Sequence, residues 1–461
     1  MSGNPQLHVG LCGAGIGGLA AAIAIARAGA EVTVLEAAEE LGEIGAGIQM
    51  TPNVARLLIA WGVDKVIGDN LVQFEELNLR RKDGTRVGGA PLSRIEGALG
   101  LPWWLVHRHH LHQGLAEVAR QHGCNIHIKS RVSSIDYQSG GKVNVKTESG
   151  KTYTFDLLIG SDGVKSVVRR TLFPNVEPSP PTGNCAYRAI VPYAQIRQDP
   201  IAKELVEKKT MEIWMAEDKY VISYPISAGE DFNMVLSHHR NPPVSTVQDV
   251  NMEDFRNEYK DFDPRLKRII DMVPSAQRWP LLATRLESWS SPQKNVVLMG
   301  DAAHSMVNHM AQGAATSMED GAFLGRCLRE VVQNRISVSD AVTIYEKGRM
   351  PKASLKQQIS FLNGAIWHLP DGPAQEARDR AMMKELDGEQ LLRSPNLYAD
   401  PATVLDVYGY NAEAHADDEL VKFIEGRERS DQRTFVTKKE AEKVMDWFLP
   451  ESEKLSVRAK L

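Results

Sequence analysis

Three glycines and a glutamate near the start of the chain have the types and spacing that bind a dinucleotide. Gly13, Gly15 and Gly18 follow a G-x-G-x-x-G pattern. The first permits a tight turn, the second lets the backbone approach a pyrophosphate, and the third lets a helix pack closely on a strand. The N-terminus of that helix offers free N–H groups and a positive dipole to phosphate. Glu36 lies where a carboxylate can accept hydrogen bonds from ribose hydroxyls, so the pattern predicts a site for FAD or NAD.

The elements that position these residues follow from hydrophobic periodicity. A short strand is predicted at 7–11, a helix at about 18–28 and a second strand at 32–36. This order predicts a β-α-β unit with a parallel strand pair. Two later strands, at 155–160 and 296–299, each end in a turn that contains glycine and aspartate.

The pattern changes between about 184 and 287, where segments such as 211–215 and 220–226 alternate as antiparallel strands do. We therefore predict a discontinuous dinucleotide domain with a β-rich substrate domain inserted in it. Beyond about 371 the charged composition predicts a peripheral extension. The predicted limits are 1–75, 100–180 and 288–340 for the dinucleotide domain, 76–99 and 181–287 for the substrate domain, and 341–461 for a C-terminal helical region with its charged extension.

Composition narrows the class of protein. The 461 residues carry 54 basic and 59 acidic side chains, a net charge of −5, which gives no electrostatic support for a nucleic-acid partner. The longest apolar stretch, 9–35, contains several glycines, Arg27 and Glu31, so we expect no membrane span. The four cysteines have the spacing of neither a metal site nor a redox pair, so we expect buried thiols and no metal.

The chain closes on Ala459-Lys460-Leu461, a variant of the Ser-Lys-Leu address. We therefore expect a peroxisomal import receptor as a partner and a peroxisomal location, with the cytoplasm as the second possibility.

Further motifs resemble those of one enzyme family. They are, in chain order, Gly47 and Gln49 in a Gly-Ala-Gly-Ile-Gln stretch, Arg108, Asp162 in Asp-Gly, Asp301 in Gly-Asp-Ala-Ala-His, and Gly313 with Ala314 at the beginning of a helix. In order and type they resemble the single-component (group A) FAD-dependent aromatic monooxygenases, salicylate hydroxylase branch, over about residues 7–370. The resemblance is greatest to 6-hydroxynicotinate 3-monooxygenases.

This resemblance implies both fold and cofactor. The fold is α/β + β: a discontinuous Rossmann-like FAD-binding domain with an inserted antiparallel-sheet substrate domain and C-terminal helices, as in p-hydroxybenzoate hydroxylase. The residues above would bind FAD, with Asp301 on its ribityl chain. Because no second G-x-G-x-x-G exists, NADH or NADPH would bind transiently as electron donor.

Four residues are candidates for the substrate site. Arg188 could grip a carboxylate or phenolate in two hydrogen bonds, or it could lie on the wet face of an ordinary strand. Tyr220 and Tyr224 share one face of a strand, where one phenol could bond a ring hydroxyl and the other could be a core residue. His309 is expected to overhang the flavin, where it could orient a carboxylate or accept a proton near neutral pH.

The implied activity is hydroxylation of a small aromatic or heteroaromatic acid with O2, decarboxylative where the attacked carbon carries the carboxylate. The specific candidate is 6-hydroxynicotinate, giving 2,5-dihydroxypyridine in nicotinate degradation. Tyr220, Asn308 and Gln49 depart from the resembled pattern, so salicylate or hydroxybenzoate hydroxylation stays open. A hydroxylase or epoxidase of a bulky secondary metabolite and a non-catalytic FAD-binding protein also stay open.

Overall fold

The computed structural model describes residues 6–42, 45–138, 141–176, 179–389, 391–426, 445 and 447–458. The terminal tripeptide Ala459-Lys460-Leu461, and with it the proposed peroxisomal address, lies outside the described residues. Among the helices of the described ranges, none has both the length and the apolar character of a membrane span.

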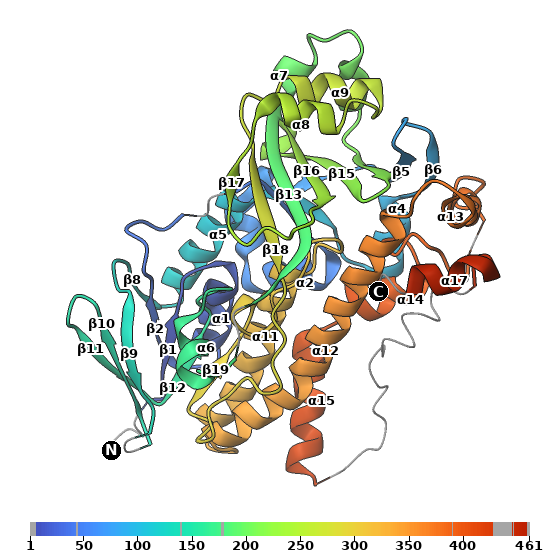
Figure 1. Cartoon of the computed structure of the whole chain (residues 1–461). Coiled ribbons are helices and arrows are strands. Elements are labelled where there is room, and N and C mark those ends of the chain that lie inside the picture. The colour runs from blue at the N-terminus through green and yellow to red at the C-terminus, as the bar shows by residue number, and fades with distance from the viewer. Residues whose placement is uncertain are drawn as a thin grey trace.

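A parallel sheet of five strands forms the first layer (Figure 1). Its order is β19 (Val296–Leu298), β12 (Leu157–Gly160), β1 (His8–Cys12), β2 (Glu31–Leu35) and β8 (Asn125–His127). The four strands other than the edge strand β8 are short, mostly apolar runs with buried side chains, as expected where helices cover a parallel sheet. The single strand predicted at 155–160 is in fact two, since Phe155 ends β11 and β12 begins at Leu157.

Two helices of this layer pack unusually closely. Helix α1 (Ile16–Arg27) lies against α11 (Gly313–Val332). A Cβ added at Gly321 or Gly325 would stand 2.6 Å from the backbone of Ala21 or 2.9 Å from that of Ala24. Small residues on both helices therefore bring α11 next to the dinucleotide loop.

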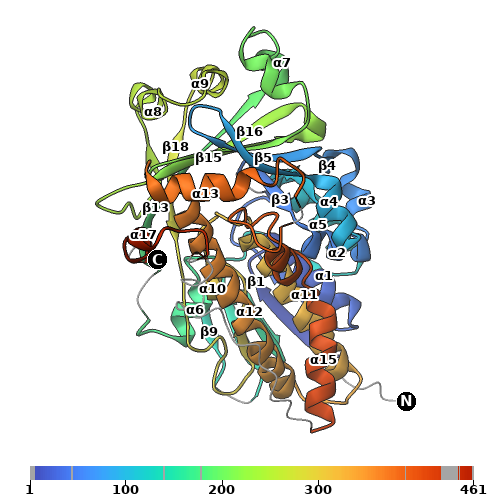
Figure 2. The ribbon, with the colours of Figure 1, turned by 90° about the vertical axis from the view of Figure 1, so that its right-hand side faces the viewer.

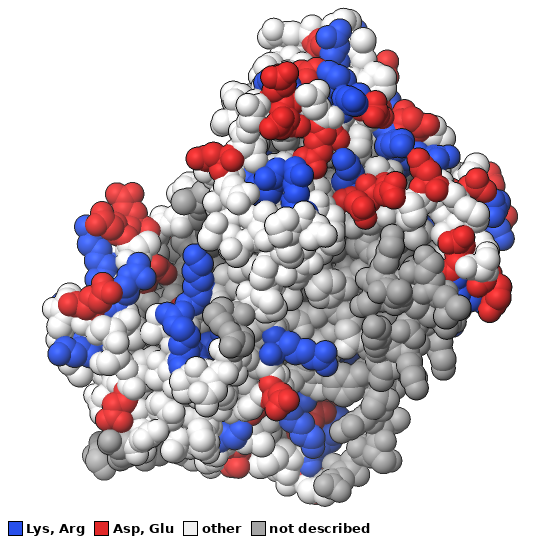
Figure 3. Space-filling model, in the orientation of Figure 1, with Lys and Arg blue, Asp and Glu red and all other residues white. Residues whose placement is uncertain are grey.

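A sheet of eight strands forms the second layer, at the top of Figure 1. Its order is β17 (Gln248–Asp249), β18 (Gln277–Leu282), β13 (Pro181–Pro192), β16 (Asp231–His239), β15 (Lys219–Ile226), β14 (Met211–Ala216), β5 (Glu76–Arg81) and β6 (Arg86–Pro91). It is antiparallel except where β14 pairs with β5 in parallel. Basic side chains on this region lie among acidic ones on the face shown in Figure 3.

Much of the described part of the region beyond 371 packs into the body of the protein, so for these residues the predicted peripheral extension is wrong. Helix α12 (Val338–Trp367) runs up to the eight-stranded sheet, and α13 (Pro373–Met383) contacts β6 (Figure 2). Helix α15 (Ala412–Ile424) lies on α11 and α12. Tyr398 and Tyr408 are fully buried. Not all buried side chains of this region are apolar, since Arg378 and Asp379 are also buried, as an ion pair 2.8 Å apart.

The remaining elements connect these layers. Two three-stranded sheets contain β3 (Gly47–Met50), β7 (Trp104–His107) and β4 (Val72–Gln73), and β11 (Thr152–Phe155), β10 (Val143–Thr147) and β9 (Val132–Asp136). The other helices are α2 (Pro52–Trp61), α3 (Val63–Ile67), α4 (Leu92–Leu99), α5 (Arg108–Gln121), α6 (Val167–Leu172), α7 (Tyr193–Ile196), α8 (Met252–Glu258), α9 (Pro264–Asp271), α10 (Asp301–His304), α14 (Pro401–Thr403) and α17 (Glu451–Arg458).

Candidate active site

A cavity of about 470 Å³ lies between the two layers. One wall comes from the turns that follow β1, β12 and β19, and from the N-terminus of α11. The opposite wall comes from β13, β15 and β18 of the eight-stranded sheet. Of the predicted site residues, the cavity wall contains Gly15, Gly47, Gln49, Arg108, Arg188, Tyr220, Tyr224, Asp301, Gly313 and Ala314.

The glycine loop closes one end of the cavity. Gly13 has φ +102° and a Cβ there would stand 2.6 Å from the Ser161 carbonyl oxygen, so a side chain is excluded. A Cβ at Gly18 would stand 2.1 Å from the Gly13 oxygen, which allows α1 to begin directly behind the loop. Glu36 accepts hydrogen bonds from the backbone N–H groups of Ala14 and Ala38, both at 2.7 Å. The acid therefore lies beside the loop, as the motif predicts.

Asp162 does not line the cavity, although Ser161 and Gly163 on either side of it do. Its carboxylate accepts hydrogen bonds from Ser166 Oγ and from the backbone N–H of Val167, so it caps helix α6 instead of facing the cavity. Burial raises its pKa, and these hydrogen bonds oppose the shift. Gly163, the next residue, does line the cavity. Asp162 thus holds the loop whose backbone forms the wall.

Asp301 faces the cavity from the beginning of α10. Its side chain is exposed toward the cavity, yet protein surrounds it closely enough that burial raises its pKa. The charges of His304, Arg108 and Arg169 oppose that rise. Gly300, with φ +59°, makes the turn that aims Asp301 inward.

The substrate-side wall is aromatic and basic. Arg188 lies on the cavity face of β13, with its guanidinium carbon 5.5 Å from the ring centroid of Trp279. Its neighbour Tyr187 points to the other face and donates a hydrogen bond to Glu258. The structure therefore places Arg188 in the cavity and not on a wet strand face.

Tyr224 lies between the two walls. A Cβ at Gly47 would stand 2.5 Å from its ring, so the glycine makes room for the tyrosine. Burial raises the pKa of Tyr224 to about 12, while the positive charges of Arg108 and Arg188 oppose the rise. The phenol is therefore neutral near pH 7 and can donate a hydrogen bond into the cavity.

Comparison with known proteins follows this geometry. The FAD binding domain family matches residues 6–355. The chain belongs to this family. It is similar to the FAD-dependent monooxygenase OpS4 of Beauveria bassiana (strain ARSEF 2860), with 33% identity over 89% of this chain and 96% of the relative. It is also similar to the 3-hydroxybenzoate 6-hydroxylase of Polaromonas naphthalenivorans, with 33% identity over 80% of this chain and 90% of the relative. A salicylate hydroxylase substrate complex shares the fold, with a TM-score of 0.71, 20% identity, and coverage of 90% of this chain and 98% of that chain.

The site of this FAD-dependent monooxygenase fits its cofactor. The glycine loop and Glu36 suit the adenosine and pyrophosphate, because backbone N–H groups and a carboxylate are placed there without side-chain obstruction. Asp301 suits the ribityl hydroxyls, and the first turn of α11 at Gly313 suits the polar edge of the flavin ring. In the part of the chain that the structure describes, no three His, Cys, Asp or Glu side chains are grouped to hold a metal ion.

His309 does not face the cavity, and this expectation is wrong. The ring is 1% exposed and accepts or donates a hydrogen bond at Nδ1, 2.9 Å from the Tyr220 hydroxyl. Gly364 of α12 makes room for it, since a Cβ there would stand 2.5 Å from the imidazole. Burial lowers the pKa of His309 to about 3, so it is neutral near pH 7 and is not a proton acceptor for the cavity. Because the Tyr220 hydroxyl is turned toward His309, Tyr220 presents its ring to the cavity.

Sequence reasoning missed three aromatic residues of the wall, one of which is Trp279, the ring beneath Arg188. Trp367, at the end of α12, and Tyr398 both line the cavity. Tyr398 is stacked between Trp103 and Trp367, with ring centroids 5.6 Å away on each side. For Trp367 and Tyr398, the one signal in the sequence was the presence of large aromatic residues in an otherwise charged region.

Proposed function

We propose that this FAD-dependent monooxygenase uses NADH or NADPH and O2 to hydroxylate a small aromatic or heteroaromatic acid. The specific candidate is 6-hydroxynicotinate. In that reaction the acid, O2, the reduced nicotinamide and a proton would give 2,5-dihydroxypyridine, CO2, water and the oxidised nicotinamide.

The observation that carries this proposal is Arg188 in an aromatic wall. A guanidinium held over Trp279 inside a cavity can grip a carboxylate through two charge-assisted hydrogen bonds. Tyr224, with a neutral phenol beside Arg188, can donate to a ring hydroxyl of the same substrate. Trp367 and Tyr398, which stack on each other and line the cavity, offer apolar ring edges against which a six-membered ring can pack.

The chain's own contribution is then orientation and exclusion of water. Bound FAD supplies the activation of O2 with electrons from the nicotinamide. Arg188 and Tyr224 fix which ring carbon faces the flavin, and the aromatic wall keeps bulk water from the reacting atoms. Asp301 and Glu36 hold the cofactor in register with that substrate position.

Hydroxybenzoate or salicylate is the second candidate. The relative from Polaromonas naphthalenivorans supports it, at 33% identity over 80% of this chain. These acids share the carboxylate that Arg188 would bind, so the wall alone supports both candidates. The third candidate is a bulky substrate without a carboxylate, which an experiment must distinguish from these small acids. The peroxisomal address at 459–461 stays a prediction from sequence.

The test is a substrate screen with FAD-loaded protein. NADH and NADPH oxidation would be followed with 6-hydroxynicotinate, salicylate and 3-hydroxybenzoate, and products identified by mass. Stimulation by 6-hydroxynicotinate well above the two benzoates supports the specific candidate. Stimulation mainly by a benzoate moves the assignment to the second candidate. No stimulation by any of these acids, from protein that retains FAD, contradicts a small-acid substrate.

A further inference from the structure

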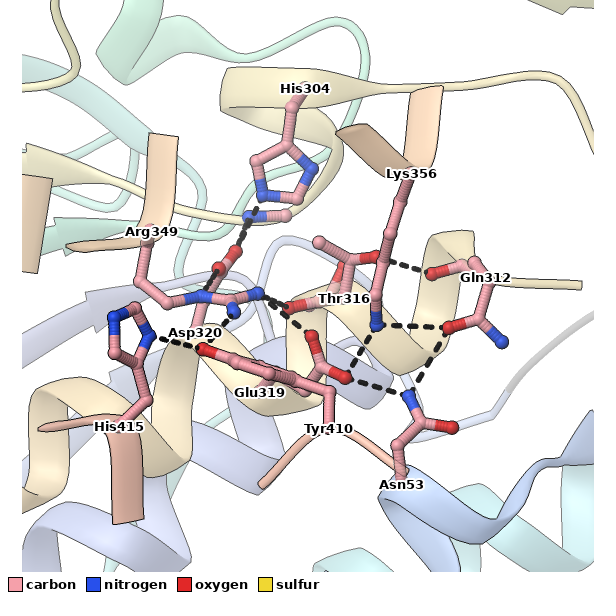
Figure 4. Close-up of polar contacts among 12 residues, drawn as sticks. Asn53, His304, Gln312, Thr316, Glu319, Asp320, Arg349, Lys356, Tyr410 and His415 are labelled. Atoms are coloured by element: carbon pink, nitrogen blue, oxygen red, sulfur yellow. Dashed lines mark hydrogen bonds and ion pairs between the residues drawn. The ribbon is translucent and has the colours of Figure 1, made fainter. Parts of the chain in front are cut away.

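A network of buried polar side chains lies behind the cavity wall (Figure 4). We call it the α11 network, and its members are Asn53, His304, Gln312, Thr316, Glu319, Asp320, Arg349, Lys356, Tyr410 and His415. Arg349, which is fully buried, contacts Glu319 at 3.0 Å and Asp320 at 2.9 Å. Lys356, 2% exposed, contacts Glu319 at 2.5 Å. Buried charges of this kind are costly unless they are paired, and here both signs are paired.

The network touches the cofactor wall at two points. Asp320 accepts a hydrogen bond from the backbone N–H of Gly300, the residue before Asp301. Gln312 is the residue before Gly313 at the beginning of α11. The network therefore holds both flavin-side elements from behind, through α11 and the turn before α10.

Lys356 acts at the second of these points. Its Nζ donates to Gln312 Oε1 at 2.9 Å, and Asn53 donates to the same oxygen at 3.1 Å. Gln312 Nε2 donates in turn to Thr51 Oγ1 at 3.0 Å. Both polar atoms of the Gln312 side chain therefore bond groups outside α11, and the side chain makes no capping bond to its own helix. The N–H groups in the first turn of α11 therefore receive no side-chain cap from Gln312. The buried Lys356 ammonium group is linked to the beginning of this helix by its hydrogen bond to Gln312.

We propose that Lys356 is a positioning residue for the flavin: by holding Gln312 and by placing its ammonium group beside the first turn of α11, it stabilises reduced, anionic FAD relative to oxidised FAD. The physical basis is that a positive charge at a helix N-terminus adds to the positive end of the helix dipole. In the low-dielectric interior its field is weakly screened. The inference requires bound FAD and does not depend on which acid is the substrate.

The first test is the two-electron midpoint potential of the FAD-loaded protein with Lys356→Met. We expect reduced FAD to lose about tenfold in affinity relative to oxidised FAD, the size of one buried unit charge acting over roughly a helix diameter. That corresponds to a midpoint potential lower by about 30 mV. Lys356→Arg keeps the charge and should restore most of the potential.

Lys352→Met is the matched control. Lys352 lies one turn earlier on α12, with its ammonium 5.3 Å from the Tyr410 ring, and no bond joins it to Gln312. It should shift the potential by less than about a third as much, because it is better solvated than Lys356 and is not bonded to the residue before α11. Equal shifts in the two variants, or an unchanged potential in folded Lys356→Met, overturn the proposal.

A measurement on the unaltered protein covers the case in which Lys356→Met does not fold. Burial lowers the pKa of Lys356 to about 8, with Glu319 opposing the shift. If the ammonium interacts with reduced FAD, reduction raises that pKa, and proton uptake steepens the potential against pH just above pH 8. The other charged or titratable groups around it are Asp320, Arg349, Lys352 and Tyr410. A plot without this change of slope would overturn the assignment to Lys356.

Discussion

Replacing Arg188 by methionine tests the substrate anchor. Methionine keeps an unbranched apolar stem against Trp279 but removes the guanidinium, which lies 5.5 Å from that ring. Hydrogen bonds to a charged partner contribute about 1.5–3 kcal/mol, and those of a buried pair lie toward the upper end. Arg108 stays in the wall and keeps part of the attraction for an anion. We therefore expect a loss of about 2–3 kcal/mol, which is about 30- to 150-fold in kcat/KM.

The assay compares a carboxylate substrate with an analogue that lacks the carboxylate. Arg188→Met should lower kcat/KM for the acid and leave that for the analogue unchanged, because only the acid uses the guanidinium. Arg188→Lys should keep the charge but lose the paired geometry, and should fall between the two. Arg197→Met is the control: its guanidinium also lies 5.5 Å from an aromatic ring, that of Tyr193, but outside the cavity wall.

Two results would refute this reasoning. An unchanged kcat/KM for the acid in Arg188→Met, with normal FAD content, would remove Arg188 from the substrate site. An equal loss for acid and analogue would mean that the residue supports the wall and does not bind the carboxylate.

Three further predictions follow from the described contacts. Asp301→Ala should purify with little FAD, measured by flavin absorbance, since its carboxylate is in the cofactor wall; normal flavin content would contradict this. His309 should make the protein less stable in acid: its folded pKa of about 3 lies below the unfolded value of about 6.5, so its contribution is present above pH 6.5 and decreases by about 2 kcal/mol between pH 7 and pH 5. Thermal unfolding should show that pH dependence reduced in His309→Gln, and an identical dependence would be evidence against it. Tyr398→Ala should cost about 3–5 kcal/mol of unfolding free energy by opening a void between Trp103 and Trp367, whereas Tyr398→Phe should be nearly neutral in the same unfolding experiment.

The cofactor side of the site could be predicted from sequence because its signals are local. The glycine loop, the turn at Asp301 and the beginning of α11 each combine a backbone requirement with the end of one element. These short patterns determine where their residues lie largely without contacts from distant parts of the chain. Asp162 shows the limit, because its motif was recognised but its cap of α6 was not.

The substrate side depended on distant contacts that a local pattern does not contain. Strand alternation separates Tyr187 from Arg188 but does not say which face meets the cavity. The orientation of His309 depends on space left by Gly364, which lies on a helix far along the chain. Tyr398 was missed because composition marked its region as solvated, while packing against Trp103 and Trp367 buries it.

Oxygen-isotope and carbon balance for 6-hydroxynicotinate turnover test the central claim most directly. With 18O2 and carboxyl-labelled substrate, the account predicts one labelled oxygen in the new ring hydroxyl and one CO2 released for each NADH or NADPH consumed in coupled turnover. Oxygen derived from water, or product that keeps its carboxylate, would contradict decarboxylative hydroxylation at this site.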